Sequence, residues 1–162
     1  MADAKTYIKD YPRPKISFNP VIPPLKRIKD KTKVDIRYCL IAPYTFVHIH
    51  WDPKIYEVVY DIEEPILTDE ENKQKEEIIT AMNNMIDFET IIEKEKSKLL
   101  EYIDKRFKLL AIELGVNLSY EGYKKIFYYL CRDFMGFNET EPLLRDYFVE
   151  DIECNGANSS VY

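Results

Sequence analysis

His48 and His50 are the only histidines of the chain, and their spacing makes them the first candidates for chemistry. They lie at positions i and i+2 of an apolar, β-branched stretch, so both imidazoles are expected on one face of a strand. Such a pair could bind a metal if Asp61 or Glu57 on an adjacent strand supplied a third ligand. A structural zinc site usually needs four ligands, and no cysteine pair is placed to help. We therefore expect no metal site and interpret both histidines as partly buried or interface residues.

Nucleophilic and acid–base catalysis have little support in the sequence. A Cys–His or Ser–His pair would have to recruit one of the same two histidines, and nothing nearby favours this. Paired carboxylates such as Glu63-Glu64 arise by chance in a chain with 29 acidic residues. The three cysteines are widely spaced and odd in number, which indicates a reducing compartment rather than a disulfide framework. We predict no catalytic residue in this chain.

Phosphate-binding loops are missing as well. Backbone amides can approach a phosphate closely where glycines allow it, and the chain has only four glycines. None of them belongs to a G-x-x-x-x-G-K-[ST] loop or to a G-x-G-x-x-G dinucleotide motif. We therefore predict no enzyme activity and no cofactor for this chain taken alone.

The charges are divided unevenly along the chain. The first 37 residues contain ten basic and four acidic side chains, and the remainder contains 13 basic and 25 acidic ones. A basic front can contact an acidic partner, an anionic membrane or nucleic acid, or it can fold back onto the acidic body. Nucleic acid is not expected, because the stacking-rich sheet motif of common RNA binders is missing. Because no apolar run reaches bilayer length, we expect a cytosolic protein.

Residues 1–33 are predicted to form a basic, proline-rich arm. Five prolines remove backbone donors and fix φ, which favours an extended, irregular segment; they are Pro12, Pro14, Pro20, Pro23 and Pro24. Four apolar or aromatic side chains could attach the arm to a neighbouring surface, and these are Tyr7, Tyr11, Phe18 and Leu25.

Residues 34–62 predict three strands. Alternation of apolar and polar residues marks 34–40 as a half-buried strand, and Ala42-Pro43 ends it. The next strand, 44–51, is apolar on both faces and should be central. Asp52-Pro53-Lys54 is a turn signal before a third strand over 56–62, with its apolar face formed by Tyr56, Val58, Tyr60 and Ile62. Loops this short require an antiparallel meander.

Three helices are expected next. Thr68 and Glu71 form a capping box for the first, whose apolar stripe comprises Ile78, Ile79, Met82, Met85 and Ile86. The second is long, ends near Gly115 and carries an apolar stripe of Phe88, Ile92, Leu99, Ile103, Phe107, Leu110 and Leu114. Ser119 caps the third, which ends at Gly136 and presents Tyr120, Tyr123, Ile126, Phe127, Leu130 and Phe134. We interpret these stripes as core.

The tail completes an α+β fold: a proline-rich arm (1–33), then a domain over 34–162 with a strand meander, three helices and the start of a further strand. Residues from Phe137 onward should form a loop and a short helical turn. A strand is expected to begin near Val149, and another to start at 159–162.

Two stretches of the sequence contain recognisable motifs. The first runs from Tyr44-Thr45-Phe46-Val47 to Tyr60 and continues as Glu64-Pro65-Ile66-Leu67-Thr68-Asp69-Glu70-Glu71. The second comprises Arg132-Asp133-Phe134-Met135-Gly136, then Pro142-Leu143-Leu144-Arg145-Asp146, then Glu150-Asp151-Ile152-Glu153-Cys154-Asn155-Gly156. Both stretches resemble the archaeal secretion-type ATPases that assemble archaella and type IV pili, and the second is similar to the R-D-x-x-G, P-L-x-x-D and E-D-I-x-C-[DN]-G series of that family in order and spacing. Glu141 and Tyr147 depart from the family pattern.

The resemblance, which covers about residues 34–162, implies the N-terminal domain of a hexameric ATPase of the type II/IV secretion superfamily. ATP and Mg²⁺ would then bind to a C-terminal core beyond Tyr162, where a phosphate loop is expected about a hundred residues further on. The implied partners are that core, neighbouring subunits and a membrane platform protein. The implied location is the cytoplasm, at the inner face of the membrane. The alternative is a standalone adaptor whose basic arm binds an anionic membrane or nucleic-acid surface.

The charged residues of the second stretch have two possible roles. They can cap the backbone and pair with one another, so that they fix a turn, or some can project into a subunit or domain interface. The residues concerned are Arg132, Asp133, Arg145, Asp146, Glu150 and Asp151.

Overall fold

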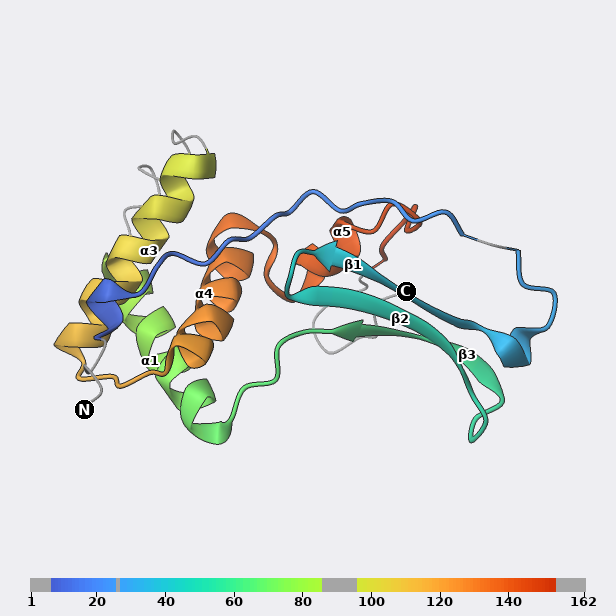
Figure 1. Ribbon diagram of the computed structural model, residues 1–162, viewed down its shortest axis with the longest axis horizontal. Coiled ribbons are helices and arrows are strands. Elements are labelled where there is room, and N and C mark those ends of the chain that lie inside the picture. The colour runs from blue at the N-terminus through green and yellow to red at the C-terminus, as the bar shows by residue number, and fades with distance from the viewer. Residues whose placement is uncertain (1–6, 26, 86–95, 154–162) are drawn as a thin grey trace, which may run out of the picture. The chain divides into compact units, whose positions relative to one another are not determined.

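The predicted α+β class is confirmed: a three-stranded antiparallel sheet and a group of helices form the fold (Figure 1). The structure is a computed structural model that describes residues 7–25, 27–85 and 96–153. The chain divides into two units. The helical unit is made from Met1–Lys15 and Ile66–Asn138, and the sheet unit from Ile16–Pro65 and Glu139–Tyr162.

The sheet consists of β1 (Asp35–Ile41), β2 (Thr45–Asp52) and β3 (Glu57–Glu63) in the order β1-β2-β3. Both pairs are antiparallel, so the meander and the central place of the second strand are as predicted. The hairpin between β2 and β3 begins with an Asp52 side chain that accepts a hydrogen bond from Lys54 N at 2.7 Å. Because the connections between the strands are short, each strand pairs with the next one along the chain.

The two faces of the sheet differ in chemistry. Tyr38, Leu40 and Val47 are buried on one face, where the expected alternation of apolar residues is clearest. On β3 the expected apolar face is partly open, because Val58 is exposed and Tyr60 is only partly buried. The opposite face carries the charged residues of the three strands and both histidines of β2.

The helical unit contains α1 (Asp69–Met85), α3 (Lys96–Glu113) and α4 (Tyr120–Met135). The predicted capping box of α1 is formed: Thr68 N donates to Glu71 Oε2 at 2.9 Å, and Glu71 N donates to Thr68 Oγ1 at 3.1 Å. Ser119 caps α4 by accepting from Gly122 N at 3.1 Å. Gly115 follows α3 with a φ of +67°, a conformation that glycine adopts without strain.

The core of the helical unit follows most of the predicted stripes. Its buried side chains include Ile78, Met82, Leu99, Ile103, Phe107, Leu110, Tyr123, Ile126, Phe127 and Leu130. Leu114 was expected in this core but is 47% exposed, because it follows the last residue of α3 and leaves the helix face where the chain turns at Gly115. Ile86, Phe88 and Ile92 lie outside the described residues.

Two of the four expected attachment residues of the arm make contacts. Tyr11 donates to Leu118 O at 3.0 Å, and its ring meets that of Tyr120 at 5.2 Å. In the sheet unit, the Phe18 ring lies 5.5 Å from the Arg145 guanidinium. Tyr7 and Leu25 remain exposed. The arm also forms two short 3₁₀ turns, Ile8–Asp10 and Lys31–Lys33, which the sequence did not indicate.

The tail forms the expected helical turn, but the strand expected near Val149 is absent from the described residues. After the 3₁₀ turn Asn138–Thr140 and the short helix α5 (Glu141–Leu144), residues 149–153 are irregular. A strand needs a backbone partner, and Val149 N instead donates to Asp146 O at 3.3 Å within its own turn. The segment 159–162 lies outside the described residues. Every helix in the described ranges is too short or too polar to cross a bilayer.

The ion pair at the start of α1 gives a pH-dependent prediction. Burial works to raise the pKa of Glu71, but hydrogen bonds from Thr68 and Lys125 outweigh it and lower the pKa below its ordinary value. A lowered pKa stabilises the fold above the ordinary value, and this stabilisation disappears as pH falls through the lowered one. We expect Glu71→Gln to lower the free energy of unfolding by about 0.5–1 kcal/mol at pH 7.

Urea unfolding of Glu71→Gln and wild type at pH 7 and pH 3 measures this difference. It should shrink at pH 3, because Glu71 loses its charge, and with it this stabilisation, as pH falls through the lowered pKa. Glu77→Gln, an exposed neutralisation on the same helix, serves as the control and should change stability little at either pH. An equal loss at both pH values for Glu71→Gln would contradict the assigned charge effect.

Candidate docking surface

The polar face of the sheet is centred on the two histidines. His48 and His50 share this face as predicted, and their rings stack with centroids 4.5 Å apart. In the register of the sheet, His48 lies between Arg37 on β1 and Asp61 on β3, while His50 lies opposite Asp35. Cross-strand partners share a face, so the imidazoles lie among carboxylates from both neighbouring strands.

His48 lies between two of these carboxylates. Its Nε2 is 2.8 Å from Asp35 Oδ1, and its Nδ1 is 3.6 Å from Glu63 Oε1. Arg37 Nε donates to the other oxygen of Glu63 at 2.6 Å, and the Arg37 guanidinium lies 4.0 Å from the centre of the Phe46 ring. The network orients these side chains on a half-exposed surface, where each ion pair stabilises the fold only slightly.

His50 is arranged differently. Its Nδ1 is buried without a hydrogen-bond partner, and the nearest carboxylate oxygen, Oδ2 of Asp61, is 3.6 Å away. Glu57, the other possible third ligand, lies opposite Asp52 in the strand register, next to the hairpin turn, and not opposite either histidine. Within the described ranges, no three His, Cys, Asp or Glu side chains are grouped so that they could hold a metal ion.

Negative charge dominates this polar face. Arg37 is its basic residue in the three strands, and its acidic residues are Asp35, Asp52, Glu57, Asp61 and Glu63. Most of these carboxylates are exposed, and Asp61 is 54% exposed at its side chain. A surface of this kind attracts a cationic partner and repels an anionic one.

On the opposite face, Asp146 anchors the turn that follows α5. The hydroxyls of Tyr38 and Tyr60 both donate to its Oδ2, at 2.7 and 2.6 Å, and Phe148 N donates to its Oδ1 at 3.0 Å. The residue is only 5% exposed. We refer to these three side chains, Tyr38, Tyr60 and Asp146, as the tyrosine–aspartate anchor.

Both tyrosines of the anchor remain hydrogen-bond donors over the physiological pH range. Burial raises the pKa of each phenol, and the adjacent Asp146 carboxylate raises it further. Sequence reasoning placed Tyr38 and Tyr60 on apolar strand faces and did not identify this role. The available signal was the choice of tyrosine over phenylalanine, because a buried phenol oxygen needs a partner.

The other predicted motif residues lie in both units. In the helical unit, the buried Arg132 donates through Nε to Asp133 at 2.7 Å and packs over the Tyr129 ring. In the sheet unit, Arg145 donates through Nε to the buried Glu141 at 2.6 Å. Glu141, a departure from the family pattern, therefore has a partner one helical turn away.

Glu150 and Asp151 are exposed, unlike the other motif residues. They line a groove of about 670 Å³ beside β3. The remaining lining residues are Tyr60, Asp61, Ile62, Leu143, Val149 and Ile152. The groove therefore combines apolar walls with three carboxylates and has no basic residue in its lining. We refer to it as the acidic groove.

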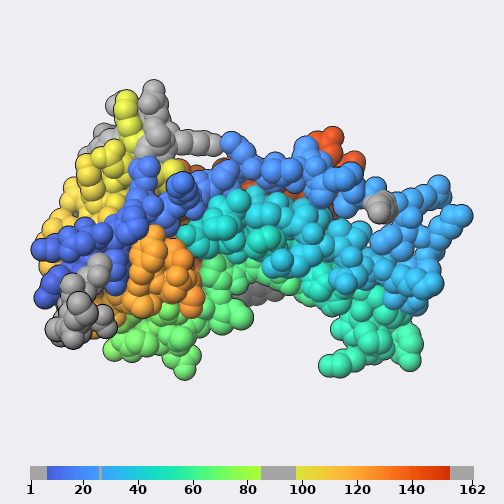
Figure 2. Space-filling model, viewed as in Figure 1, coloured from blue at the N-terminus to red at the C-terminus, as the bar shows by residue number. Residues whose placement is uncertain are grey.

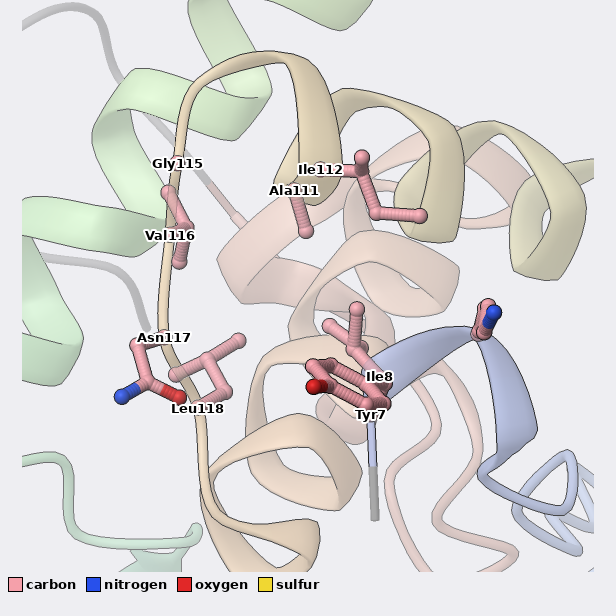
Figure 3. Close-up of a pocket in the computed structure, with 9 residues that line it drawn as sticks. Tyr7, Ile8, Ala111, Ile112, Gly115, Val116, Asn117 and Leu118 are labelled. Atoms are coloured by element: carbon pink, nitrogen blue, oxygen red, sulfur yellow. The ribbon is translucent and has the colours of Figure 1, made fainter. Parts of the chain in front are cut away.

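A second hollow lies in the helical unit, between the start of the arm and the end of α3 (Figure 3). Its volume is about 620 Å³, and Tyr7 and Ile8 lie across from the loop Gly115–Leu118. The walls are mainly aliphatic, and their polar side chains are those of Tyr7, Lys9 and Asn117. A small-molecule site normally adds several convergent polar groups to such walls, so we do not assign a ligand here.

A buried polar cluster in the helical unit was also missed by sequence reasoning. The Tyr123 hydroxyl donates to Asp104, and Lys108 Nζ donates to the other oxygen of Asp104 at 2.9 Å. Lys108 Nζ also donates to Tyr11 O at 2.8 Å, so the cluster ties the arm to α3 and α4. Burial raises the pKa of the nearby Cys131 thiol, which makes it a poor nucleophile.

Comparison with known proteins adds one archaeal relative. The chain is 30% identical over 103 residues to a protein of Methanocaldococcus jannaschii named "Uncharacterized protein MJ1288". The match covers 64% of this chain and 40% of the relative, so the chain spans less than half of the protein that it resembles. That name states no activity. No family model matches the chain.

The tyrosine–aspartate anchor predicts a non-additive loss of stability. We expect Tyr38→Phe or Tyr60→Phe alone to lower the free energy of unfolding by about 1 kcal/mol, because Asp146 Oδ2 keeps one donor. The double variant should lose more than the sum of the two, because a buried carboxylate oxygen is then left without either hydroxyl.

Fluorescence of Trp51, the single tryptophan, which lies on β2, reports urea unfolding of the sheet unit. Tyr56→Phe is the control: this residue is 73% exposed, so stability should change little. Strictly additive losses in the double variant would show that the two hydroxyls do not act on a shared, buried acceptor.

Proposed function

We propose that this chain is a non-catalytic docking segment of a larger archaeal ATPase that drives assembly of pili or archaella, or secretion. The anchoring of Asp146 carries the proposal. This residue is the aspartate of the P-L-x-x-D motif, and its carboxylate binds the two strand tyrosines. Because these hydrogen bonds give the motif aspartate a structural role, we assign the contacts with partners to the exposed acidic residues near it.

The sequence resemblance and the distribution of charge support the same proposal. The motif series occurs in the family's order and spacing, and the relative is an archaeal protein longer than the matched stretch. The motif aspartate is buried, whereas Glu150 and Asp151 are exposed and line the acidic groove. The role proposed for the segment is to hold neighbouring subunits and a membrane platform protein in the cytoplasm, while ATP and Mg²⁺ bind to a core elsewhere in the parent polypeptide.

This proposal predicts a clear division of activity. The purified 162-residue chain should release no phosphate from ATP with Mg²⁺, because the chemistry depends on a phosphate loop that this chain lacks. A longer polypeptide that includes the C-terminal core should hydrolyse ATP and sediment as a hexamer. Phosphate release and sedimentation velocity measure the two properties. Magnesium-dependent turnover by the purified chain would reject the proposed role.

The exposed basic residues of the arm support a second candidate, a standalone adaptor on an anionic surface. Arg27, Lys29, Lys31 and Lys33 are all exposed. If this candidate holds, the chain should sediment with phosphatidylglycerol vesicles at 50 mM salt, and binding should fall at least tenfold at 300 mM. The variant Arg27→Glu/Lys29→Glu should lose binding, whereas Lys73→Glu/Lys105→Glu, in the helical unit, should retain it. Wild-type protein that stays in the supernatant at low salt would eliminate the adaptor.

A further inference from the structure

The outer edge of β3 is unpaired in the described part of the chain. β3 ends the strand order β1-β2-β3, and its ladder runs to β2 only. None of the backbone hydrogen bonds described outside the sheet involves residues 57–63. An edge strand with free N–H and C=O groups is a template for a further strand from another chain.

The side chains of this edge discourage pairing of two β3 strands. A symmetric antiparallel pair centred on Tyr60 would place Glu57 of one copy opposite Glu63 of the other, at both ends of the ladder. Asp61 adds a further carboxylate to the same face. The edge therefore favours a strand with basic side chains, and the acidic groove next to it extends the same preference.

The arm of the same sequence has the complementary chemistry. Between residues 16 and 33 it contains five basic side chains and one acidic one. Pro20, Pro23 and Pro24 cannot donate to a ladder, so the segment available for pairing starts at Leu25. Leu25, Ile28 and the basic residues Arg27 and Lys29 are exposed.

The backbone of the arm is available as well. From Asn19 to Lys29, the described residues take part in no backbone–backbone hydrogen bond. The next contacts are those of the turn Lys31–Lys33, where Asp30 accepts from Thr32 N and Lys31 lies 4.9 Å from the Trp51 ring. A basic segment without described backbone–backbone hydrogen bonds therefore precedes the turn Lys31–Lys33 and β1.

Within one copy, the arm and the β3 edge lie on opposite sides of the sheet. Ser17 forms a bridge with Ala42 just after β1, and the arm follows the β1 side of the sheet unit (Figures 1 and 2). Two strand spacings, about 10 Å, separate β1 from β3. A contact between arm and β3 edge is therefore favoured between copies, and such a head-to-tail contact generates a ring or a filament.

We propose that residues 27–29 of one copy add as a strand to β3 of a second copy, with the basic side chains of Arg27 and Lys29 at Asp61, Glu150 and Asp151. Main-chain hydrogen bonds supply affinity in this mode, and the charge pattern selects the partner. Ile28 alternates with these basic side chains along the strand and therefore packs against the apolar walls of the acidic groove. This goes beyond the proposed function, because it depends on strand pairing and charge and not on the ATPase assignment.

Charge reversal tests the proposal with the full chain. In sedimentation velocity, wild type should self-associate at 50 mM salt, and its affinity for a second copy should be at least tenfold lower at 300 mM salt. Arg27→Glu/Lys29→Glu (arm-reversed) and Asp61→Lys/Asp151→Lys (groove-reversed) should each weaken association at least tenfold. An equimolar mixture of the two variants should associate again, because the reversed arm then meets the reversed groove. Lys73→Glu/Lys105→Glu should behave like wild type.

Hydrogen exchange identifies the strand. On association, the outward amides of β3, which do not bond to β2, should become protected together with the amides of 27–29, by at least tenfold in rate. A wild-type chain that stays monomeric at millimolar concentration and low salt would overturn the proposal. So would protection of these outward β3 amides in the monomer, since a strand of the same chain then occupies the edge, or a mixture of reversed variants that fails to associate. None of these outcomes affects the phosphate-release test of the proposed function.

Discussion

The shared acceptor of the tyrosine–aspartate anchor is the interaction on which the sheet unit depends. A three-stranded sheet buries little on its own, and one face needs a cover. Asp146 links the turn after α5 to both edge strands at once, through Tyr38 on β1 and Tyr60 on β3. Because the carboxylate is buried, each donor that it loses raises the cost of keeping its charge away from water. The last described residues are thereby directed along β3, where they form one wall of the acidic groove.

The same arrangement separates structural charges from surface charges. Asp146, Glu141 and Arg132 are buried and engaged, whereas Glu150 and Asp151 are exposed. Both roles considered for the motif residues, fixing a turn and reaching an interface, therefore have candidates among different members of the set. The polar face of the sheet adds carboxylates around the stacked histidines, so acidic side chains of the sheet unit lie on β3 and beside it.

Local signals predicted the secondary structure well. The capping box at Thr68 and Glu71, the cap at Ser119 and the turn at Gly115 depend on residues within four positions of one another, so the sequence was enough to identify them. Strand alternation likewise predicted the meander. The prediction of a strand near Val149 was wrong for the opposite reason. The residue pattern was suitable, but a strand also needs a neighbouring strand as its hydrogen-bond partner, and residues 149–153 have none in the described structure.

By itself, the sequence determined the α+β class, the order of the elements, the basic arm before an acidic body and the lack of a phosphate loop in this chain. Tertiary structure alone decided that Asp146 accepts hydrogen bonds from tyrosines 108 and 86 positions away, and that Asp104, Tyr123 and Lys108 form one buried cluster. It also decided which edge of the sheet stays open. The physical reason is range: caps and turns are set by neighbours in the chain, whereas the partners of a buried polar group or a strand edge are set by packing between distant segments.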